Sequence, residues 1–347
     1  MLLEAQLGLG DSLRFQKRSI FYTDNLKHNK LDVLVDSTLQ SFMQSPQNCG
    51  ISIGISQNGE TTFYNYGEIR RDSKIQCDQN TIYEIGSLSS TFCGMLLIQA
   101  VLEKKISLED DIRKYLPGKF AGLVYEKVSI RIKHLAMHTS GLPHLPGDLI
   151  TEANFDPKDP YKNYSKEQIF MYLQKVKLSA EPGTVRDYSS LGVALLGIIL
   201  EKIYATSFEN LIKVKIASPF GMSNTAIHLT EQQSVHFAQG YNDDGEPTPH
   251  WNLNSFVAAG GIRSTTNDLL IYLNNNLEEK DKEKSALSWF IKKTKQGNTL
   301  MYQSGGTLGS GGFTGFIKEK KCSLVILANS GRNVDYIAIA ILNYLQQ

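Results

Sequence analysis

The spacing of apolar residues near the start of the chain predicts a helix followed by a β-hairpin. Residues 29–44 place leucine, valine and phenylalanine at roughly helical spacing, which indicates an amphipathic helix. Residues 50–56 alternate isoleucine with small residues, a period of two that is typical of a strand. Asn58 and Gly59 form a strong turn signal, and residues 61–66 return as a β-rich run. The chain therefore opens with a helix and two antiparallel strands.

Helical spacing dominates the middle of the chain, and strand patterns return near its end. Residues 91–270 are mostly helical in spacing, with breaks that contain glycine and proline. Residues 312–317 and 323–328 predict two more strands, and residues 334–345 predict an apolar helix. This order predicts an α+β fold in which both ends of the chain build one antiparallel sheet flanked by the terminal helices. The middle is expected to form an inserted all-helical lobe.

The length of 347 residues favours two lobes with ligand access between them. We expect an N-terminal extension over residues 1–29 and a sheet domain built from residues 30–80 and 260–347. Residues 81–259 are expected to form the helical lobe, and an active-site cleft is predicted between this lobe and the sheet domain.

The charge and cysteine content exclude several classes of function. Lysine and arginine number 36 against 35 aspartate and glutamate, without a long basic stretch, so nucleic acid is not an expected partner. The four cysteines have neither CxxC nor CxxH spacing, so neither a metal nor a redox cofactor is expected. His134, His138 and His144 also lack an acidic or cysteine partner at ligand spacing, and His138 is interpreted as structural.

Neither a membrane span nor a secretory signal is expected from the sequence. No apolar run approaches the ~20 residues that cross a bilayer. Residues 1–18 lack a basic region followed by an apolar core. We therefore expect a cytoplasmic protein, or an extracytoplasmic one if an upstream signal was removed.

The first stretch with possible chemistry is residues 84–92, which lead directly into an apolar run. A serine at position 87 would lie at a helix N-terminus, where the dipole and unpaired amides favour negative charge on an attacking oxygen. The simpler interpretation is that Ser87 only caps the helix, because serine is a favoured N-cap residue.

Two later stretches have the same two interpretations. Tyr188 precedes another apolar helix and could act as a general acid or base if positive charge lowered the pKa of its phenol, although most such tyrosines only pack and hydrogen-bond. Residues 302–309 contain three glycines, which allow backbone to approach a ligand closely or simply form a bulge or turn. No Gly-Lys-Ser/Thr follows, so this is not a phosphate loop.

In order and spacing, these three stretches resemble the serine β-lactamase and penicillin-binding-protein superfamily. The resemblance is closest to class C β-lactamases, D-alanyl-D-alanine carboxypeptidases and related esterases, and it covers about residues 30–346. Further matches, in the same order as in that superfamily, lie at residues 62–67, 106–110, 130–135, 138–143, 182–184, 219–222, 258–261 and 327–330. The resemblance implies the β-lactamase/DD-peptidase fold with Ser87 as nucleophile.

Each of the three catalytic motifs has lost one member. Ser87 is in place, but the lysine that follows it three residues later in the superfamily is Ser90 here. The Tyr-x-Asn element keeps its tyrosine and has Ser190 in place of asparagine. The Lys- or His-x-Gly element keeps Gly305 and has Gln303 in place of the cation.

These losses argue against efficient β-lactam hydrolysis. A general base typically contributes ~10²–10⁴ in rate. Gln303 also no longer attracts the carboxylate that β-lactams and D-alanyl peptides carry. The predicted catalytic residues are Ser87 and Tyr188, and the predicted substrate-binding residues are Ser90, Ser190, Gln303, Ser304, Gly305 and Thr307.

The resemblance further implies an oxyanion hole made of two backbone amides. These would be the amide of Ser87 and that of Thr307 or Ser310. Backbone donors do not depend on the missing side chains, so the hole is expected to persist.

Two functional hypotheses remain open from the sequence. In the first, the chain is a diverged serine hydrolase or acyl-transfer enzyme that uses Ser87 as nucleophile or Tyr188 as acid or base. Its substrate would be a neutral ester, amide, lactone or biosynthetic intermediate bound in the cleft. In the second, the chain has lost catalysis and binds a small ligand or a protein partner in the old cleft.

Overall fold

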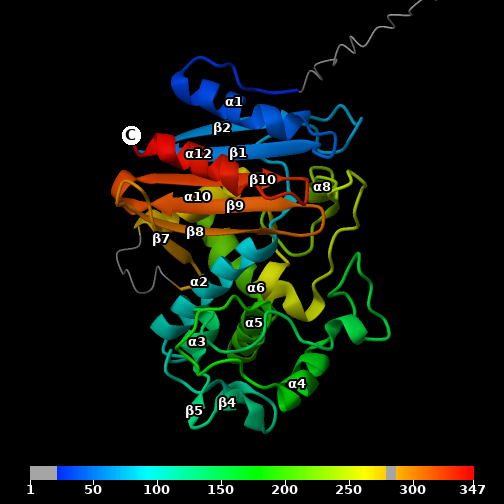
Figure 1. Cartoon of the computed structure of the whole chain (residues 1–347), viewed down its shortest axis with the longest axis vertical. Coiled ribbons are helices and arrows are strands. Elements are labelled where there is room, and N and C mark those ends of the chain that lie inside the picture. The colour runs from blue at the N-terminus through cyan, green and yellow to red at the C-terminus, as the bar shows by residue number, and fades with distance from the viewer. Residues whose placement is uncertain (1–21, 279–286) are drawn as a thin grey trace, which may run out of the picture.

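A six-stranded antiparallel sheet forms the upper half of the molecule in Figure 1. The structure, a computed structural model, describes residues 22–278 and 287–347. In sheet order the strands are β2 (Glu60–Gly67), β1 (Gly50–Gln57), β10 (Cys322–Ala328), β9 (Gly311–Ile317), β8 (Thr299–Gly306) and β7 (Phe290–Lys293). Because β1 pairs with β10, the prediction that both ends of the chain build one sheet is confirmed.

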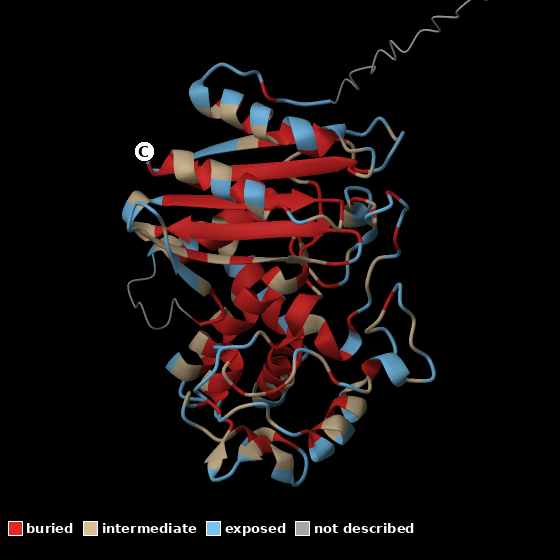
Figure 2. Cartoon of the chain, viewed as in Figure 1, coloured by how far each residue is buried: buried red, intermediate tan, exposed pale blue. Residues whose placement is uncertain are grey.

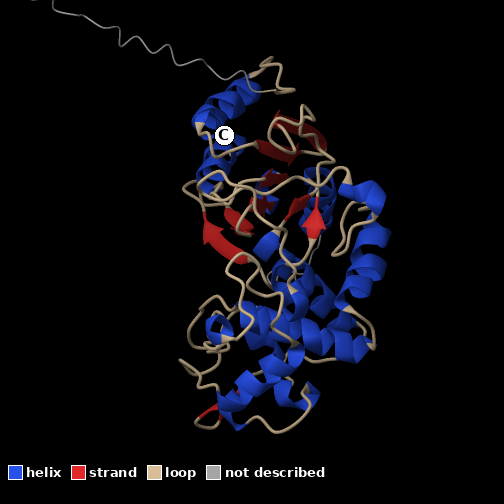
Figure 3. Cartoon of the chain, turned by 90° about the vertical axis from the view of Figure 1, so that its right-hand side faces the viewer, coloured by secondary structure: helices blue, strands red, loops and turns tan. Residues whose placement is uncertain are grey.

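Helices cover both faces of this sheet, as the side view in Figure 3 shows. On one face lie α1 (Lys30–Gln44) and α12 (Asp335–Leu345), whose Leu39 and Ile337 are fully buried in one core with the strands. On the other face, α10 (Thr266–Glu278) packs against β1, β9 and β10. The α+β architecture with terminal helices is as predicted.

Isoleucines and small residues alternate along β1 because its two faces pack against different helices. Ile51, Ile53 and Ile55 belong to the core beneath α1 and α12. The intervening residues face α10, which comes so close that a Cβ at Gly54 would lie 2.8 Å from the Leu270 side chain. Small residues on that face therefore allow the helix to seat against the sheet.

The middle of the chain forms the lower lobe in Figure 1, and Figure 2 shows that its central helices α2 and α5 are largely buried. The helices in this part of the chain are α2 (Ser89–Leu102), α3 (Ile132–Ala136), α4 (Lys166–Lys175), α5 (Ser190–Tyr204), α6 (Phe208–Ile212), α7 (Ser218–Phe220), α8 (Glu231–Ser234) and α9 (Val257–Gly260). Of these, α8 lies beside the sheet in Figure 1 and not in the lower lobe. The short 3-10 segments of this part of the chain are η1 (Gly86–Leu88), η2 (Ile112–Tyr115), η3 (Ala121–Leu123), η4 (Leu149–Thr151) and η6 (Asn254–Phe256), and η5 (Lys213–Ala217) is a π-helix. A further 3-10 segment, η7 (Lys318–Lys320), connects β9 to β10 in the sheet.

The structure differs from the expected fold in the small strands. The middle segment is not purely helical, because β4 (Val124–Tyr125) pairs with β5 (Val128–Ser129), and β3 (Tyr83–Glu84) pairs with β6 (Arg263–Ser264). The sequence also did not predict β7 and β8. Neither has a clean alternation of apolar and polar residues, and β8 ends in two glycines, so its pairing with β9 is what defines it as a strand.

Part of the predicted N-terminal extension lies against the sheet. Residues 1–21 lie outside the described part of the chain, but Thr23 forms a β-bridge with Tyr66 of β2. The Asn25 side-chain amide donates hydrogen bonds to the Tyr66 hydroxyl at 2.7 Å and to the Asp32 carbonyl at 2.8 Å. Residues 22–29 therefore belong to the sheet domain.

Within the described ranges, no single helix is both long and apolar enough to cross a membrane, and one pair of helices bent by 78°, Ser190–Tyr204 with Phe208–Phe220, passes by length and composition. A search of the same residues for clusters of three or more histidine, cysteine, aspartate or glutamate side chains that could hold a metal ion found none.

Candidate active site

Ser87 lies in the one-turn segment η1, where the chain passes from β3 into α2. Gly86 has φ of +51°, and a Cβ there would lie 2.4 Å from the Gly306 carbonyl oxygen. A Cβ at Gly305 would lie 2.7 Å from the Ser87 Cβ and 3.1 Å from its Oγ. Glycine at these positions therefore lets the end of β8 lie directly against Ser87.

This contact gives a prediction about stability. Gly86→Ala should lower the free energy of unfolding by about 2 kcal/mol more than Gly59→Ala, measured by urea titration. Gly59 has φ of +90°, and no atom lies within 4 Å of the place that a Cβ would take, so its alanine suffers backbone strain without a clash. Equal losses of unfolding free energy in the two variants would contradict this prediction, because β8 would then move aside for the new Cβ without destabilising the fold.

Ser87 does not cap a helix, so that simpler interpretation of the serine is wrong. The N-cap residues of η1 and α2 are Ile85 and Leu88, and neither makes a side-chain capping bond. Ser87 instead lines a pocket of about 220 Å³ between the sheet and the helical lobe. Its other lining residues are Gly86, His144, Tyr161, Ser190, Trp251, Leu253, Phe256, Ala259, Gly260 and Gly306. No aspartate, glutamate, lysine or arginine is among these lining residues, all of which lie in the described part of the chain.

Tyr188 approaches Ser87 from the segment that precedes α5. Its hydroxyl lies near the hydroxyls of Ser87, Ser190 and Ser90, which partly offset the effect of burial on its pKa. Burial nevertheless raises the pKa of the Tyr188 phenol above its usual value. Positive charge does not lower this pKa, so the phenol is a proton donor at neutral pH and not the base that the sequence allowed as an option.

The residues that replace the two motif cations both hold the Ser87 backbone. Ser90 Oγ donates a hydrogen bond to the Ser87 carbonyl at 2.8 Å. Gln303 Nε2 donates a second to the same carbonyl at 3.2 Å. Ser90 and Gln303 are almost completely buried. The positions that carry charge in the family pattern therefore hold the Ser87 main chain with neutral hydrogen bonds.

Two predicted substrate-binding residues have side chains that face other partners. Ser304 follows Gln303 on β8, and its hydroxyl donates to Asp335 at the start of α12 at 3.4 Å. The Thr307 hydroxyl donates to Glu84 at 2.8 Å. Gly305 lies against Ser87 as described, and Ser190 lines the pocket.

The pair of backbone amides available for an oxyanion hole differs from the pair that includes Thr307. The Thr307 amide donates to the Ser310 carbonyl at 2.9 Å and is therefore occupied in the turn between β8 and β9. Because hydrogen-bonded and non-hydrogen-bonded pairs alternate in an antiparallel ladder, the Gly306 amide, one residue earlier, points away from β9. Gly306 also lines the pocket beside Ser87. The amides of Ser87 and Gly306 are thus the pair that the geometry offers.

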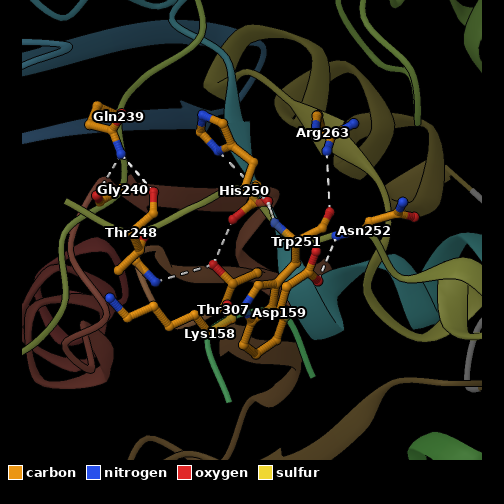
Figure 4. A network of polar contacts seen from close by, with 12 residues as sticks. Lys158, Asp159, Gln239, Gly240, Thr248, His250, Trp251, Asn252, Arg263 and Thr307 are labelled. Atoms are coloured by element: carbon orange, nitrogen blue, oxygen red, sulfur yellow. Dashed lines mark hydrogen bonds and ion pairs between the residues drawn. The ribbon is translucent and has the colours of Figure 1, made fainter. Parts of the chain in front are cut away.

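Sequence reasoning missed the buried carboxylate of Glu84, whose neighbours Trp251, Thr307 and Arg263 are labelled in Figure 4. Glu84 accepts a hydrogen bond from the Trp251 amide at 2.7 Å as well as the bond from Thr307. Burial raises the pKa of Glu84, and the neighbouring Arg263 guanidinium opposes that rise. Glu84 therefore ties β3, the β8–β9 turn and the Trp251 wall together. Its partners lie 167 and 223 residues away, so no local pattern identifies it.

His138 supports Tyr188 from behind, in keeping with a structural role. The ring centroids of His138 and Tyr188 are 4.5 Å apart, and His138 Nδ1 accepts a hydrogen bond from the Ser189 amide at 3.3 Å. Burial lowers the pKa of His138 to about 4. Because Nδ1 accepts, the proton of the neutral ring is on Nε2.

This pKa predicts a loss of stability in mild acid. Between about pH 6.5 and pH 4 the unfolded chain takes up a proton on His138 while the folded chain does not, so stability falls as the pH falls. The contribution is about 3 kcal/mol. His138→Asn, which suits the observed φ of +56°, should flatten the pH dependence of urea unfolding over this interval, whereas His236→Asn at an exposed position should not. An unchanged profile in His138→Asn would contradict the assignment.

The family model of β-lactamases matches residues 35–346, so the chain belongs to the β-lactamase family and has its serine hydrolase fold. A β-lactamase of Providencia stuartii is 34% identical over 247 residues, which cover 70% of this chain. The aligned part spans only 59% of that relative's length.

Solved structures agree with the family assignment. A class C β-lactamase is 27% identical with a TM-score of 0.77, and the alignment covers 92% of this chain and 99% of that one. A β-lactamase/D-alanine carboxypeptidase from Pseudomonas syringae has the same TM-score at 24% identity, covering 91% and 99% of the two chains, and supports the fold.

Proposed function

We propose that the protein is a serine hydrolase or acyl-transfer enzyme that acts on a neutral ester, amide or lactone. The observation that carries this proposal is the position of Ser87, which lines a pocket between the lobes whose lining residues include no aspartate, glutamate, lysine or arginine. In the proposed reaction Ser87 Oγ bonds to the substrate carbonyl carbon and the amides of Ser87 and Gly306 hold the resulting oxyanion. The Ser87 hydroxyl proton is transferred to the leaving group in the same step, and the Tyr188 phenol is a suitable relay because it gives up its own proton as it receives that of Ser87.

Efficient β-lactam hydrolysis does not fit this site. Gln303 and Ser190 stand where the family pattern has a cation and an asparagine, and Gln303 spends its amide N–H on the Ser87 carbonyl. Arg186 lies two residues before Tyr188, but its guanidinium sits over the Phe290 ring at 4.6 Å and donates to the Trp289 carbonyl. A substrate carboxylate would therefore enter without a charged partner.

The alternative is a non-catalytic protein that binds a ligand in the same pocket. The raised pKa of Tyr188 favours it, because a protonated phenol can take the Ser87 proton only if it gives up its own at the same time. Ser90 also cannot act as the base, since a hydroxyl has no basicity at neutral pH.

A matched pair of esters tests the proposal. The wild type should hydrolyse an uncharged p-nitrophenyl ester with kcat/KM about 10- to 100-fold above that for an ester of similar size that carries a carboxylate. Ser87→Ala should abolish the turnover of both esters. Turnover that survives Ser87→Ala, or the reverse preference, would contradict the proposal; no turnover across a panel of esters and penicillins would favour the binding protein.

A further inference from the structure

The pocket that Ser87 lines offers few side chains able to move a proton. Among its lining residues, all of which lie in the described part of the chain, only His144 and Tyr161 carry titratable side chains. Burial raises the pKa of Tyr161 to about 12, so its phenol stays protonated at neutral pH. Imidazole is the side chain that most often serves as a general base. Of the described lining residues, His144 is therefore the one that can accept a proton from a molecule in the pocket.

Hydrogen bonds fix the main chain around His144 to the start of α5. The Ser189 hydroxyl donates to the Pro143 carbonyl at 2.7 Å, and the Leu191 amide donates to the His144 carbonyl at 3.1 Å. Ser190, which lies between these two donors in the chain, lines the pocket itself. His144 is therefore anchored to one wall of the pocket.

The imidazole of His144 remains accessible although it lies beside an aromatic ring. Its centroid is 5.5 Å from that of the Tyr188 ring, and His144 is exposed. Within the described part of the chain, no hydrogen bond or ion pair holds its ring nitrogens. His138, by contrast, is buried, and its Nδ1 accepts a hydrogen bond from the Ser189 amide. Of these two histidines beside Tyr188, His144 is the one whose surroundings suit proton transfer.

We propose that His144 is the general base that activates the water that hydrolyses the acyl-Ser87 intermediate. The inference rests on the proposed function, which it deepens by assigning a catalytic residue to the second half of the reaction. Because liquid water takes ~30 Å³ per molecule, the cavity of about 220 Å³ holds a short acyl group and a water together. Ser87 and His144 line the same cavity, so a water beside the acyl group can contact the imidazole.

The atoms and protons of this step balance. The water oxygen bonds to the acyl carbon while the imidazole takes one water proton, and the amides of Ser87 and Gly306 hold the oxyanion. The bond between the acyl carbon and Ser87 Oγ then breaks, Oγ takes up the proton that the imidazolium returns, and the carboxylic acid leaves. The Tyr188 phenol is a suitable relay for this return, because its ring lies beside that of His144 and its hydroxyl lies near that of Ser87.

The decay of the acyl-enzyme tests this role on the whole chain, with p-nitrophenyl butyrate as the probe. The burst of p-nitrophenol gives the acylation rate, and intact-mass spectra after removal of the free ester give the decay of butyryl-Ser87. His144→Ala should slow the decay about 10²-fold and change the burst rate by less than about twofold. His144→Phe keeps a ring beside Tyr188 but has no ring nitrogen, so its acyl-enzyme should decay equally slowly. His236→Gln, at an exposed position, should decay at the wild-type rate.

Added imidazole gives a readout that a packing role would not move. Because position 144 is exposed, imidazole should accelerate the decay of the His144→Ala acyl-enzyme about tenfold. The same addition should change the decay in His144→Phe less, because the phenylalanine ring fills the space. Removing the free ester beforehand prevents its direct reaction with imidazole.

The outcomes separate this inference from the proposed function. If butyryl-Ser87 forms but decays at the wild-type rate in His144→Ala or in His144→Phe, the assignment of His144 is wrong and the hydrolase stands. A burst slowed as much as the decay would also overturn the assignment, because His144 would then not act on the water alone. If the ester never acylates Ser87, the proposed function is wrong and this inference is wrong with it.

Discussion

A lysine introduced at position 90 is expected to raise the rate of Ser87-dependent ester hydrolysis by about 10²–10⁴-fold, the contribution of a general base. Position 90 lies three residues after Ser87, so its side chain is on the same face of the turn. The Tyr188 hydroxyl, near Ser90 and without a hydrogen-bond partner in the described structure, would accept a bond from the new ammonium. The measurement is steady-state turnover of an uncharged p-nitrophenyl ester by Ser90→Lys and by Ser90→Lys/Ser87→Ala.

Ser90→Met is the matched control, because methionine has nearly the length of lysine without its charge. Ser90 is fully buried, so melting curves must show that both variants fold. A folded Ser90→Lys protein with no more activity than Ser90→Met would mean that the missing base is not what limits this site.

The second large effect is expected when both motif cations are restored. Ser90→Lys/Gln303→Lys should be acylated by penicillin about 10²-fold faster than Ser90→Lys alone, since position 303 would again provide an electrostatic partner for the substrate carboxylate. Gln303 Nε2 lies 3.2 Å from the Ser87 carbonyl, so a cation there is at the site itself. Intact-mass spectra over time give the acylation rate.

Ser90→Lys/Gln303→Met is the control for this double variant, because it removes the amide without adding charge. Equal acylation of the two double variants would show that charge at position 303 does not decide substrate preference. Rapid penicillin acylation of the wild type would contradict the account more broadly.

Most of the fold could be predicted from the sequence because its main helices and strands have strong local patterns of apolar residues. The isoleucine alternation in residues 50–57 marks a strand between two packed faces, and the apolar run of α12 marks a buried terminal helix. The strands β7 and β8 could not be predicted in this way. Their register is defined by pairing with each other and with β9, and the glycines at the end of β8 serve the contact with Ser87 instead of strand propensity.

Site residues that belong to short sequence motifs could be predicted. Site residues whose hydrogen-bond partners lie far away in the sequence could not. Ser87, Tyr188 and Gln303 could be named because each stands in a local pattern, and the structure brings them together. Glu84 and the aromatic wall of Trp251 could not be named, since their hydrogen bond joins residues 167 positions apart. The raised pKa of Tyr188 was equally hidden, because it depends on burial by the folded chain.

The most direct test of the central claim, that Ser87 is a reactive nucleophile in an uncharged pocket, is peptide mapping after treatment with a fluorophosphonate. We expect one adduct per chain, located on Ser87, and no adduct on a Ser87→Ala variant that has the same melting temperature. A wild-type protein that stays unlabelled, or that carries its adduct on another residue, would contradict this claim.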